Sequence, residues 1–159
     1  MRRKDRETSE DMAWAIFDKA NHAVISVVDQ AGKPYSVPML VARKERSVYY
    51  HSFFRGHMYE IMETSPDVCI TSISIASVVP KSNDLVFASA ILFGKGHVVE
   101  DDEEKMMATR LICEKVAADN LDKFESKIPF SLPHLGVVRI DISKITGKAN
   151  LPGVSQDAL

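Results

Sequence analysis

Hydrophobic residues recur along the chain at two spacings, which predict where helices and strands lie. Near the start, Thr8 and Asp11 have the spacing of a capping box, and apolar residues then follow at helical spacing up to Asn21. A second helix is expected to begin at the acidic pair 101–102, because carboxylates favour the positive end of a helix dipole. Its core-facing stripe advances in four-residue steps through Ala108, Ile112 and Val116. The sequence therefore predicts two long amphipathic helices.

The other apolar stretches are short, rich in β-branched residues and bounded by polar turns, which is typical of strands. Six strands are predicted, at residues 23–28, 35–42, 47–52, 68–75, 87–94 and 136–143. A short helix is expected at 57–63, and the fifth strand has room to run on to Glu100. Pro38 lies inside the second strand, where it cannot donate a ladder hydrogen bond. This position favours a sheet edge, a bulge or a backbone that faces a ligand.

The order of these elements predicts the fold class. Strands that follow one another through short polar turns pair in the antiparallel sense, and six strands with few helices indicate a small barrel. The second long helix leaves room for the last strand to return and close the sheet. We therefore expect a mainly β fold with flanking helices (α+β), built on a six-stranded antiparallel barrel. Residues 1–150 are expected to form a single domain, and residues 151–159 a flexible C-terminal tail.

Composition narrows the range of functions. The chain has 159 residues, of which 45% are hydrophobic and 26% charged, as in an ordinary soluble domain. Its formal net charge of -2 gives no broad basic field for nucleic acid or an anionic membrane. The sequence also lacks an apolar run of transmembrane or signal-peptide length. Cys69 and Cys113 have no metal-type spacing and are expected to be buried, reduced thiols and not a disulfide. These features favour a cytoplasmic protein.

The segment YYHSFFRGHM carries the strongest candidate chemistry. A predicted strand ends at His51 and Ser52, and a predicted helix begins after Gly56. The free N–H groups of a helix N-terminus, together with the helix dipole, bind anions. Ser52, Arg55 and His57 would complete a phosphate cradle. The alternative is a polar turn with a surface histidine, because the segment contains no P-loop or GxGxxG pattern.

Other constellations of reactive side chains are weaker. His51 and His57 lie six residues apart, and no carboxylate or cysteine completes a zinc-binding set around them. Ser52, His57 and Asp67 can be written as a nucleophile triad, but the sequence gives no signal for the strained turn that such a nucleophile occupies. Three more histidines stand alone and are interpreted as structural or solvent-facing: His22, His97 and His134.

Six motifs in order give the chain a family resemblance that covers nearly its whole length. They are MRRKDRE, DQAGKPYSVP, VYYHSFFRGHMYEIM, PDVCIT, FASAILFGKGHVVEDDEEK and VVRIDISKITGKAN. In this order they resemble the FMN-binding split-barrel (pyridoxamine 5'-phosphate oxidase-like) superfamily, and within it the nitroimidazole-resistance branch, which is similar to nitroimidazole reductases.

The resemblance implies a split barrel that forms a homodimer and holds a flavin, usually FMN, between its subunits; FAD and haem rank behind FMN. By motif position, eight residues would surround the flavin. His51, Ser52, Gly56 and His57 would lie around the phosphate, Val37 and Pro38 would offer backbone to the isoalloxazine ring, and Ser89 and Ile91 would meet the ribityl chain or the ring.

The chain departs from the family pattern at two positions. Met58 stands where a lysine commonly follows Gly-His, which removes one positive charge from the phosphate region, and Ala88 replaces a residue that is often polar or basic. The chain also lacks the Arg- and Trp-containing C-terminal element of true pyridoxamine phosphate oxidases. We therefore do not expect that vitamin-related activity.

The leading functional hypothesis is an FMN-dependent oxidoreductase that reduces small nitro-aromatic or quinone-like compounds. In such a site the flavin carries the electrons and the protein supplies orientation and electrostatics, so no residue is assigned as acid or base. One alternative is a non-catalytic binding protein of the same fold that holds haem, flavin or deazaflavin, with His51, His57 or His97 as a haem ligand. Another is a dimer without a cofactor.

Overall fold

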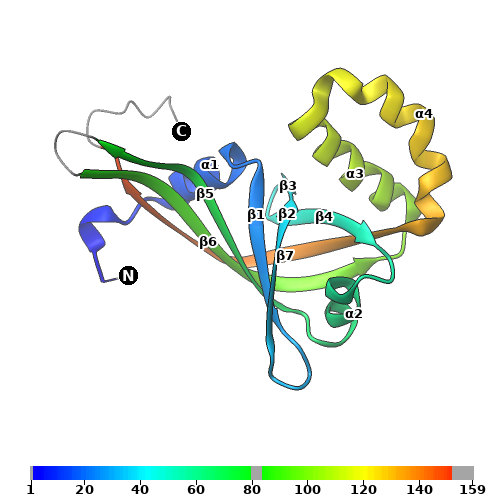
Figure 1. Cartoon of the computed structure of the whole chain (residues 1–159), viewed down its shortest axis with the longest axis horizontal. Coiled ribbons are helices and arrows are strands. Elements are labelled where there is room, and N and C mark those ends of the chain that lie inside the picture. The colour runs from blue at the N-terminus through cyan, green and yellow to red at the C-terminus, as the bar shows by residue number, and fades with distance from the viewer. Residues whose placement is uncertain (1, 80–83, 152–159) are drawn as a thin grey trace.

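The computed structural model describes residues 2–79 and 84–151, in which seven strands, four α-helices and three 3-10 turns are found (Figure 1). The strands are β1 (His22–Val28), β2 (Pro34–Leu40), β3 (Ala42–Lys44), β4 (Ser47–Phe53), β5 (Asp67–Val79), β6 (Asp84–Val99) and β7 (Leu135–Asn150). The helices are α1 (Glu10–Lys19), α2 (His57–Thr64), α3 (Asp102–Ala117) and α4 (Leu121–Ser131). The 3-10 turns are η1 (Lys4–Arg6), η2 (Ala118–Asn120) and η3 (Leu132–His134).

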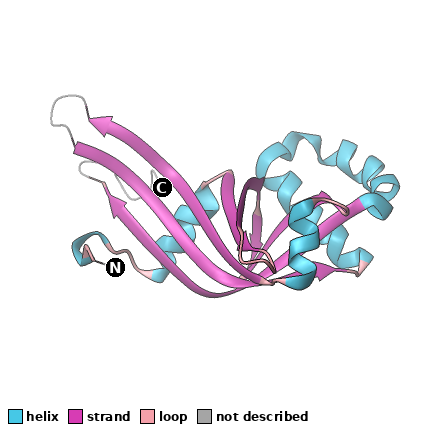
Figure 2. Ribbon diagram, turned by 60° about the horizontal axis from the view of Figure 1, so that its bottom comes forward, coloured by secondary structure: helices cyan, strands magenta, loops and turns pink. Residues whose placement is uncertain are grey.

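The strands form one antiparallel sheet in the order β2-β1-β5-β6-β7-β4-β3. Strands β2 and β3 therefore occupy opposite edges, although only Val41 separates them in the chain. The sheet must curl to bring these edges together, and this curling makes the half-barrel on the right of Figure 1. Beyond the barrel, β5, β6 and β7 continue as a three-stranded arm (Figure 2).

The predicted class, mainly β with flanking helices and an antiparallel barrel, is confirmed, with seven strands in place of six. The extra strand arises because the predicted stretch 35–42 turns a corner at Val41 and divides into β2 and β3. The side chain of Val41 is buried, so this corner is held by the core. The last strand is longer than predicted, because it continues into the arm as far as Asn150 after a register shift at Ser143, beyond which the alternation resumes from Ile145.

The helix starts are set by their caps. Ser9, and not the predicted Thr8, caps α1: its hydroxyl accepts a hydrogen bond from the Met12 N–H at 3.2 Å. Asp101 caps α3 as expected, accepting from the Glu104 N–H at 2.7 Å. Helix α4 is absent from the sequence prediction, since Pro129 within it is a residue that normally ends a helix.

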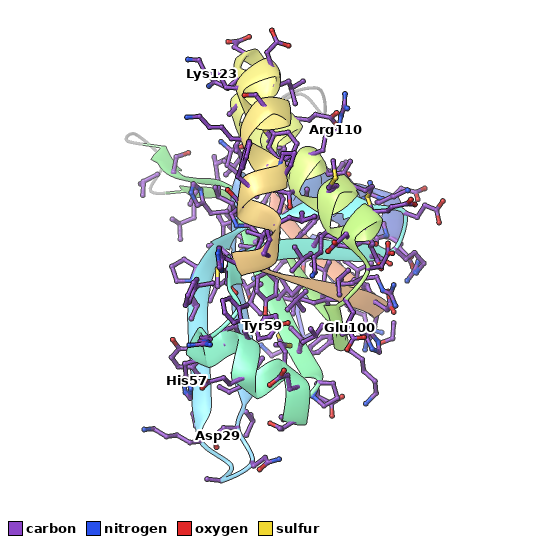
Figure 3. The ribbon with its side chains drawn as sticks, turned by 90° about the vertical axis from the view of Figure 1, so that its right-hand side faces the viewer. Asp29, His57, Tyr59, Glu100, Arg110 and Lys123 are labelled. Carbon is purple, nitrogen blue, oxygen red and sulfur yellow. The ribbon has the colours of Figure 1, made fainter. Side chains whose placement is uncertain are left out.

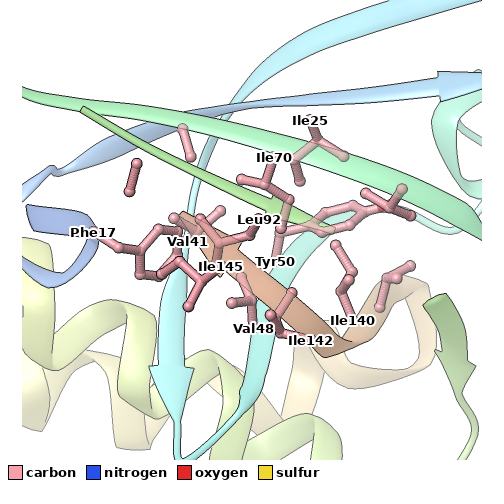
Figure 4. Packing of buried hydrophobic residues seen from close by; sticks show 14 of the residues in the cluster. Phe17, Ile25, Val41, Val48, Tyr50, Ile70, Leu92, Ile140, Ile142 and Ile145 are labelled. Atoms are coloured by element: carbon pink, nitrogen blue, oxygen red, sulfur yellow. The ribbon is translucent and has the colours of Figure 1, made fainter. Parts of the chain in front are cut away.

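Side chains on the inner face of the curled sheet form the main core, which α1 closes from one side (Figure 4). Its largest fully buried members are Tyr50, Phe17, Ile16, Ile25, Ile70, Leu92 and Ile140. The hydroxyl of Tyr50 has no hydrogen-bond partner in the described part of the chain, and burial raises the pKa of this phenol. Cys69 and Cys113 are free, as predicted, but both are only partly buried.

Trp14 of α1 covers one end of the barrel. Its ring lies beneath the guanidinium groups of Arg43 and Arg46, whose central carbons are 4.7 and 5.8 Å from the ring centroid. The same two arginines form ion pairs with Asp18 and Glu10 of α1. Trp14 is itself 8% exposed and belongs to the main core. Cation–π contacts and ion pairs together fasten α1 to the β3–β4 hairpin.

None of the helices within residues 2–79 and 84–151 is long and apolar enough to span a membrane. Of the predicted tail at 151–159, only Leu151 belongs to the described residues, and it packs against the core.

Helix α1 can approach β7 closely because residue 147 is glycine. The Thr8 N–H donates to the Gly147 carbonyl at 3.1 Å. A Cβ atom on Gly147 would lie 2.1 Å from Thr8 Oγ1 and 2.8 Å from Ala13 Cβ. No side chain fits there without moving the helix.

We expect Gly147→Ala to lower the free energy of unfolding by about 1–3 kcal/mol, the usual cost of overpacking. Chemical denaturation followed by the fluorescence of Trp14, the single tryptophan, measures the change. Lys144→Ala, at an exposed position of the same strand, is the control and should alter stability by less than about 0.5 kcal/mol. Equal stability of the two variants would contradict the close approach.

Candidate functional site

The turn from β4 into α2 leaves the N-terminus of α2 open. Gly56 is the N-cap residue, and it supplies no side chain to the N–H groups of the first helical turn. Its own N–H donates to the Phe53 carbonyl at 2.9 Å. A Cβ at this position would lie 3.1 Å from that carbonyl, so glycine suits the tight turn. The geometry is that of an uncapped anion-binding helix end.

Helix α2 lies beside the edge strand β2. The ring of His57 stands edge-on to the ring of Tyr35, with centroids 4.7 Å apart, and its Nδ1 lies 3.9 Å from Glu60 Oε2 (Figure 3 labels His57). Both members of this His57–Glu60 pair are well exposed. His57 therefore lies where the start of α2 contacts β2, and its ring remains accessible to a ligand.

Ser52 and His51 are neighbours in β4, but strand alternation turns their side chains to opposite faces. Ser52 is half-buried on the same face as the core residue Tyr50, and its hydroxyl donates to the Phe53 carbonyl at 3.3 Å. His51 projects to the other face, where helix α4 passes over it. Ser52, Gly56 and His57 thus belong to one turn, whereas His51 faces a different surface.

The two departures from the family pattern lie in the core. Met58 is 4% exposed and packs among the barrel side chains, and Ala88 is fully buried. A side chain at residue 58 points away from the open helix end. The absence of a lysine there therefore removes no charge from the surface that surrounds Gly56.

Pro38 and Ile91 lie in one row across the outer face of the sheet. The paired positions run from Pro38 to Val24, Thr71, Ile91 and Thr146, and directly opposed residues point to the same side. Ser89 belongs to the adjacent row, opposite Ile73 and Lys148. The Val37 side chain points to the opposite face and packs against the core.

Strand β2 is an edge strand, paired only with β1 among the described residues. The edge interpretation of Pro38 is therefore confirmed, since a missing N–H is tolerated where no ladder bond is required. Along the free edge of β2, backbone groups of Val37 and its neighbours remain available to a ligand.

The outer face of β1, β5 and β6 is apolar and uncovered. Its large exposed side chains are Val24, Val28, Ile73, Ile91 and Phe93, which are 39–58% exposed. A hollow of about 630 Å³ lies on this face, bordered by Ser36, Cys69, Phe93 and His97. We call this surface the outer apolar face. A contiguous apolar surface of this kind marks an interaction site.

A polar network borders the outer apolar face, and sequence reasoning did not find it. Arg139 donates to Glu104 at 3.0 Å, and the Tyr49 hydroxyl donates to the same carboxylate at 3.0 Å. His97 Nε2 lies 3.4 Å from Asp141 Oδ2. Burial, followed by the hydrogen bond to Glu104, raises the pKa of Tyr49 to about 12. The members come from β4, β6, β7 and α3, so only the paired register brings them together.

No group of three His, Cys, Asp or Glu side chains in residues 2–79 and 84–151 could hold a metal ion.

The structure divides the predicted cofactor residues into two sets. One lies at the β4–α2 turn and the other along β2 and β6, and His51 lies apart from both.

The sequence model described as pyridoxamine 5'-phosphate oxidase matches residues 9–149. The chain therefore belongs to this family, and the family expected from the motifs is confirmed. A search of curated proteins finds no match.

Several solved structures share the fold. A candidate 5-nitroimidazole antibiotic resistance protein from Bacteroides thetaiotaomicron is 24% identical, with a TM-score of 0.73 over 88% of this chain and 83% of that one. The FAD and haem binding protein from Mycobacterium smegmatis is 15% identical, with a TM-score of 0.77 over 96% of this chain and 78% of that one. The flavocytochrome Anf3 from Azotobacter vinelandii is 18% identical, with a TM-score of 0.73 over 89% of this chain and 67% of that one.

His51 provides a pH-dependent prediction. Its side chain is exposed to the hollows beside α4, yet desolvation by the surrounding protein lowers the pKa of His51 below its usual 6.5. Between the lowered value and 6.5 the unfolded chain binds more protons than the folded one. The contribution of His51 to stability is therefore complete above pH 6.5 and is lost as the pH falls through the lowered pKa.

We expect His51→Gln to reduce the acid-induced loss of stability in this range. Denaturant midpoints measured as a function of pH would show a smaller fall below pH 6.5 than in the wild type. An imidazole titration by NMR that gave His51 a pKa at or above 6.5 would contradict the argument.

Proposed function

We propose that this protein is a flavoprotein that binds FMN at a site completed by a second copy of the chain, and that it reduces small nitro-aromatic or quinone-like compounds. The observation that carries the proposal is the outer apolar face. This surface lies uncovered beside the free edge of β2, and the open N-terminus of α2 adjoins the same edge. The proposal keeps the cytoplasmic location expected from the sequence.

The β4–α2 turn fits a flavin phosphate. The first turn of α2 has free N–H groups, Gly56 lets a ligand approach the backbone, and Ser52 adds a hydroxyl. Arg55 precedes Gly56 and is exposed, so its guanidinium is free to reach an anion while its central carbon lies 5.0 Å from the Phe54 ring centroid. His57 adds a further donor beside Tyr35.

The second set of residues fits the flavin ring. The free edge of β2 at Val37 and Pro38 offers backbone atoms to the polar edge of an isoalloxazine, while Ile91 offers apolar contact across the outer face. The Ser89 hydroxyl, which donates weakly to the Lys148 carbonyl at 3.5 Å, can turn to a ribityl hydroxyl. A bound flavin would carry electrons from a reductant to the acceptor. These residues of the chain bind and orient the flavin.

The names of the structural neighbours support the two parts of the proposal. One neighbour is named for binding FAD and haem and another is a flavocytochrome, which supports a flavin. A third is a candidate nitroimidazole resistance protein, which supports a nitro-aromatic acceptor.

The haem-binding alternative also stays a prediction. Of its three proposed ligands, His57 stands edge-on to Tyr35 and His97 pairs with Asp141, whereas His51 faces a hollow. His51 is therefore the residue to replace first if the purified protein shows a haem spectrum.

We expect Arg55→Ala to weaken FMN binding about fivefold while leaving riboflavin binding unchanged, because only FMN carries the phosphate. Quenching of flavin fluorescence on titration with protein measures both affinities. Lys44→Ala removes one exposed charge from β3, away from α2, and is the matched control. An equal loss of FMN and riboflavin affinity would refute a phosphate site at this turn.

We expect Phe93→Glu to convert a homodimer into a monomer, because the substitution buries a carboxylate in the apolar contact. Phe130→Glu is the control: Phe130 is 83% exposed, more than the 43% of Phe93, but it lies on α4. Light scattering after gel filtration gives both masses. A wild type with the mass of one chain, or a dimeric Phe93→Glu variant, would exclude this face as the interface.

A further inference from the structure

Helix α4 does not lie flat on the barrel. It packs against α3 and the adjoining 3-10 turns η2 and η3, and Figure 3 shows the two helices standing together above the level of α2. Between α4 and β4 lie two hollows of about 560 and 360 Å³. Both are bordered by His51, Ser131 and Leu135, so they form one continuous surface depression, the α4 groove.

The α4 groove has an apolar floor and a cationic end. Phe124, Ile128 and Leu135 supply the floor, and Asn120, Lys123 and Lys127 border one end. Lys123 and Lys127 lie one helical turn apart, so both ammonium groups reach the same space. No carboxylate is found among the described side chains that line the groove. Neither lysine has an ion-pair partner in the part of the chain that the structure describes.

The other end of the α4 groove is aromatic. Phe53 and Phe130 border it and are 59% and 83% exposed, a large apolar area for a monomer surface to leave uncovered. Phe54 stacks at a tilt with Phe53, 4.9 Å between centroids, and lies 6.2 Å from the ring of His134. Flat side chains around an open depression favour a flat ligand.

We propose that the α4 groove binds a small aromatic anion. The ligand ring lies on the apolar floor beside His51, and its carboxylate or phosphate lies between Lys123 and Lys127. Two ammonium groups at one end of an apolar surface favour an anion, because neither charge is neutralised by a carboxylate of the described residues. A free aromatic carboxylate and a nucleoside monophosphate share this chemistry. The groove meets the flavin site proposed above at Ser52, which lines both, but its lysines and apolar floor lie outside that site and do not require a bound flavin.

Isothermal titration calorimetry of the full-length protein, as purified, tests the proposal with three probes. They are 4-nitrobenzoate, AMP and nitrobenzene, the last being the ring of the first probe without its carboxylate. At least one anionic probe is expected to bind, and nitrobenzene at least about tenfold more weakly than 4-nitrobenzoate, the equivalent of one lost charge-assisted hydrogen bond. Tighter binding of 4-nitrobenzoate would identify the ligand as a free aromatic carboxylate, and tighter binding of AMP would identify it as a nucleoside monophosphate.

The double variant Lys123→Gln/Lys127→Gln is expected to weaken the anionic probes about tenfold or more and to leave nitrobenzene unchanged. The double variant Lys33→Gln/Lys44→Gln removes two exposed charges from hairpins outside the groove, and it should bind all three probes like the wild type. Failure of both anionic probes to bind, or equal binding by the wild type and the Lys123/Lys127 variant, would overturn the proposal. The FMN affinity of each variant, measured in parallel, separates this outcome from a failure of the flavin site.

Discussion

The closure of the sheet at Val41 is the constraint on which the rest of the structure depends. Strands β2 and β3 are consecutive in the chain but lie at opposite edges of the seven-stranded sheet. A single residue can join them only if the sheet curls until its edges meet. Curling separates an inner face, filled by Tyr50 and the aliphatic side chains around it, from an outer face. Helix α3 covers the outer face at Tyr49 and Val137, whereas the outer apolar face on β1, β5 and β6 stays exposed.

The candidate site follows from the same constraint. Because β2 pairs on one side only, its other edge is free and lies beside α2, where Tyr35 contacts His57. Three features thus lie next to one another, although they come from different segments of the chain. They are the open end of α2, the free edge of β2 and the outer apolar face. This arrangement offers a flavin an anion-binding turn, a polar backbone edge and an apolar surface. A flavin ring on the exposed outer apolar face would need a second copy of the chain to cover it, so cofactor binding and dimerisation are parts of one proposal.

Much of this could be predicted from the sequence, and the failures have physical causes. Local signals identified the Asp101 cap and the first hairpin, and they gave a sheet edge as one of three interpretations of Pro38, because these features depend on a few neighbouring residues. The division of residues 35–42 into two strands was not predictable, since the corner at Val41 is imposed by distant pairing. Helix α4 was missed because Pro129 is a strong local signal against a helix, stronger than the helical spacing of Phe124 and Ile128 that favours one.

The site residues show the same limit. The turn that contains Ser52, Gly56 and His57 was found from the local pattern. His51 was grouped with Ser52 by motif, although the alternation of side chains along a strand already predicts that the two point to opposite faces. The inward direction of Met58 depends on how α2 packs on the barrel, so a motif comparison counted it as a lost charge. The polar network of Tyr49, Glu104 and Arg139 joins three distant segments, and no local signal identifies it.

Gel filtration of the untagged protein after incubation with FMN, with mass from light scattering and visible absorption recorded together, tests the central claim most directly. The account predicts flavin absorption that elutes with a species of twice the chain mass. A colourless dimer, or flavin bound to a species of one chain mass, would contradict a flavin site completed by a second copy.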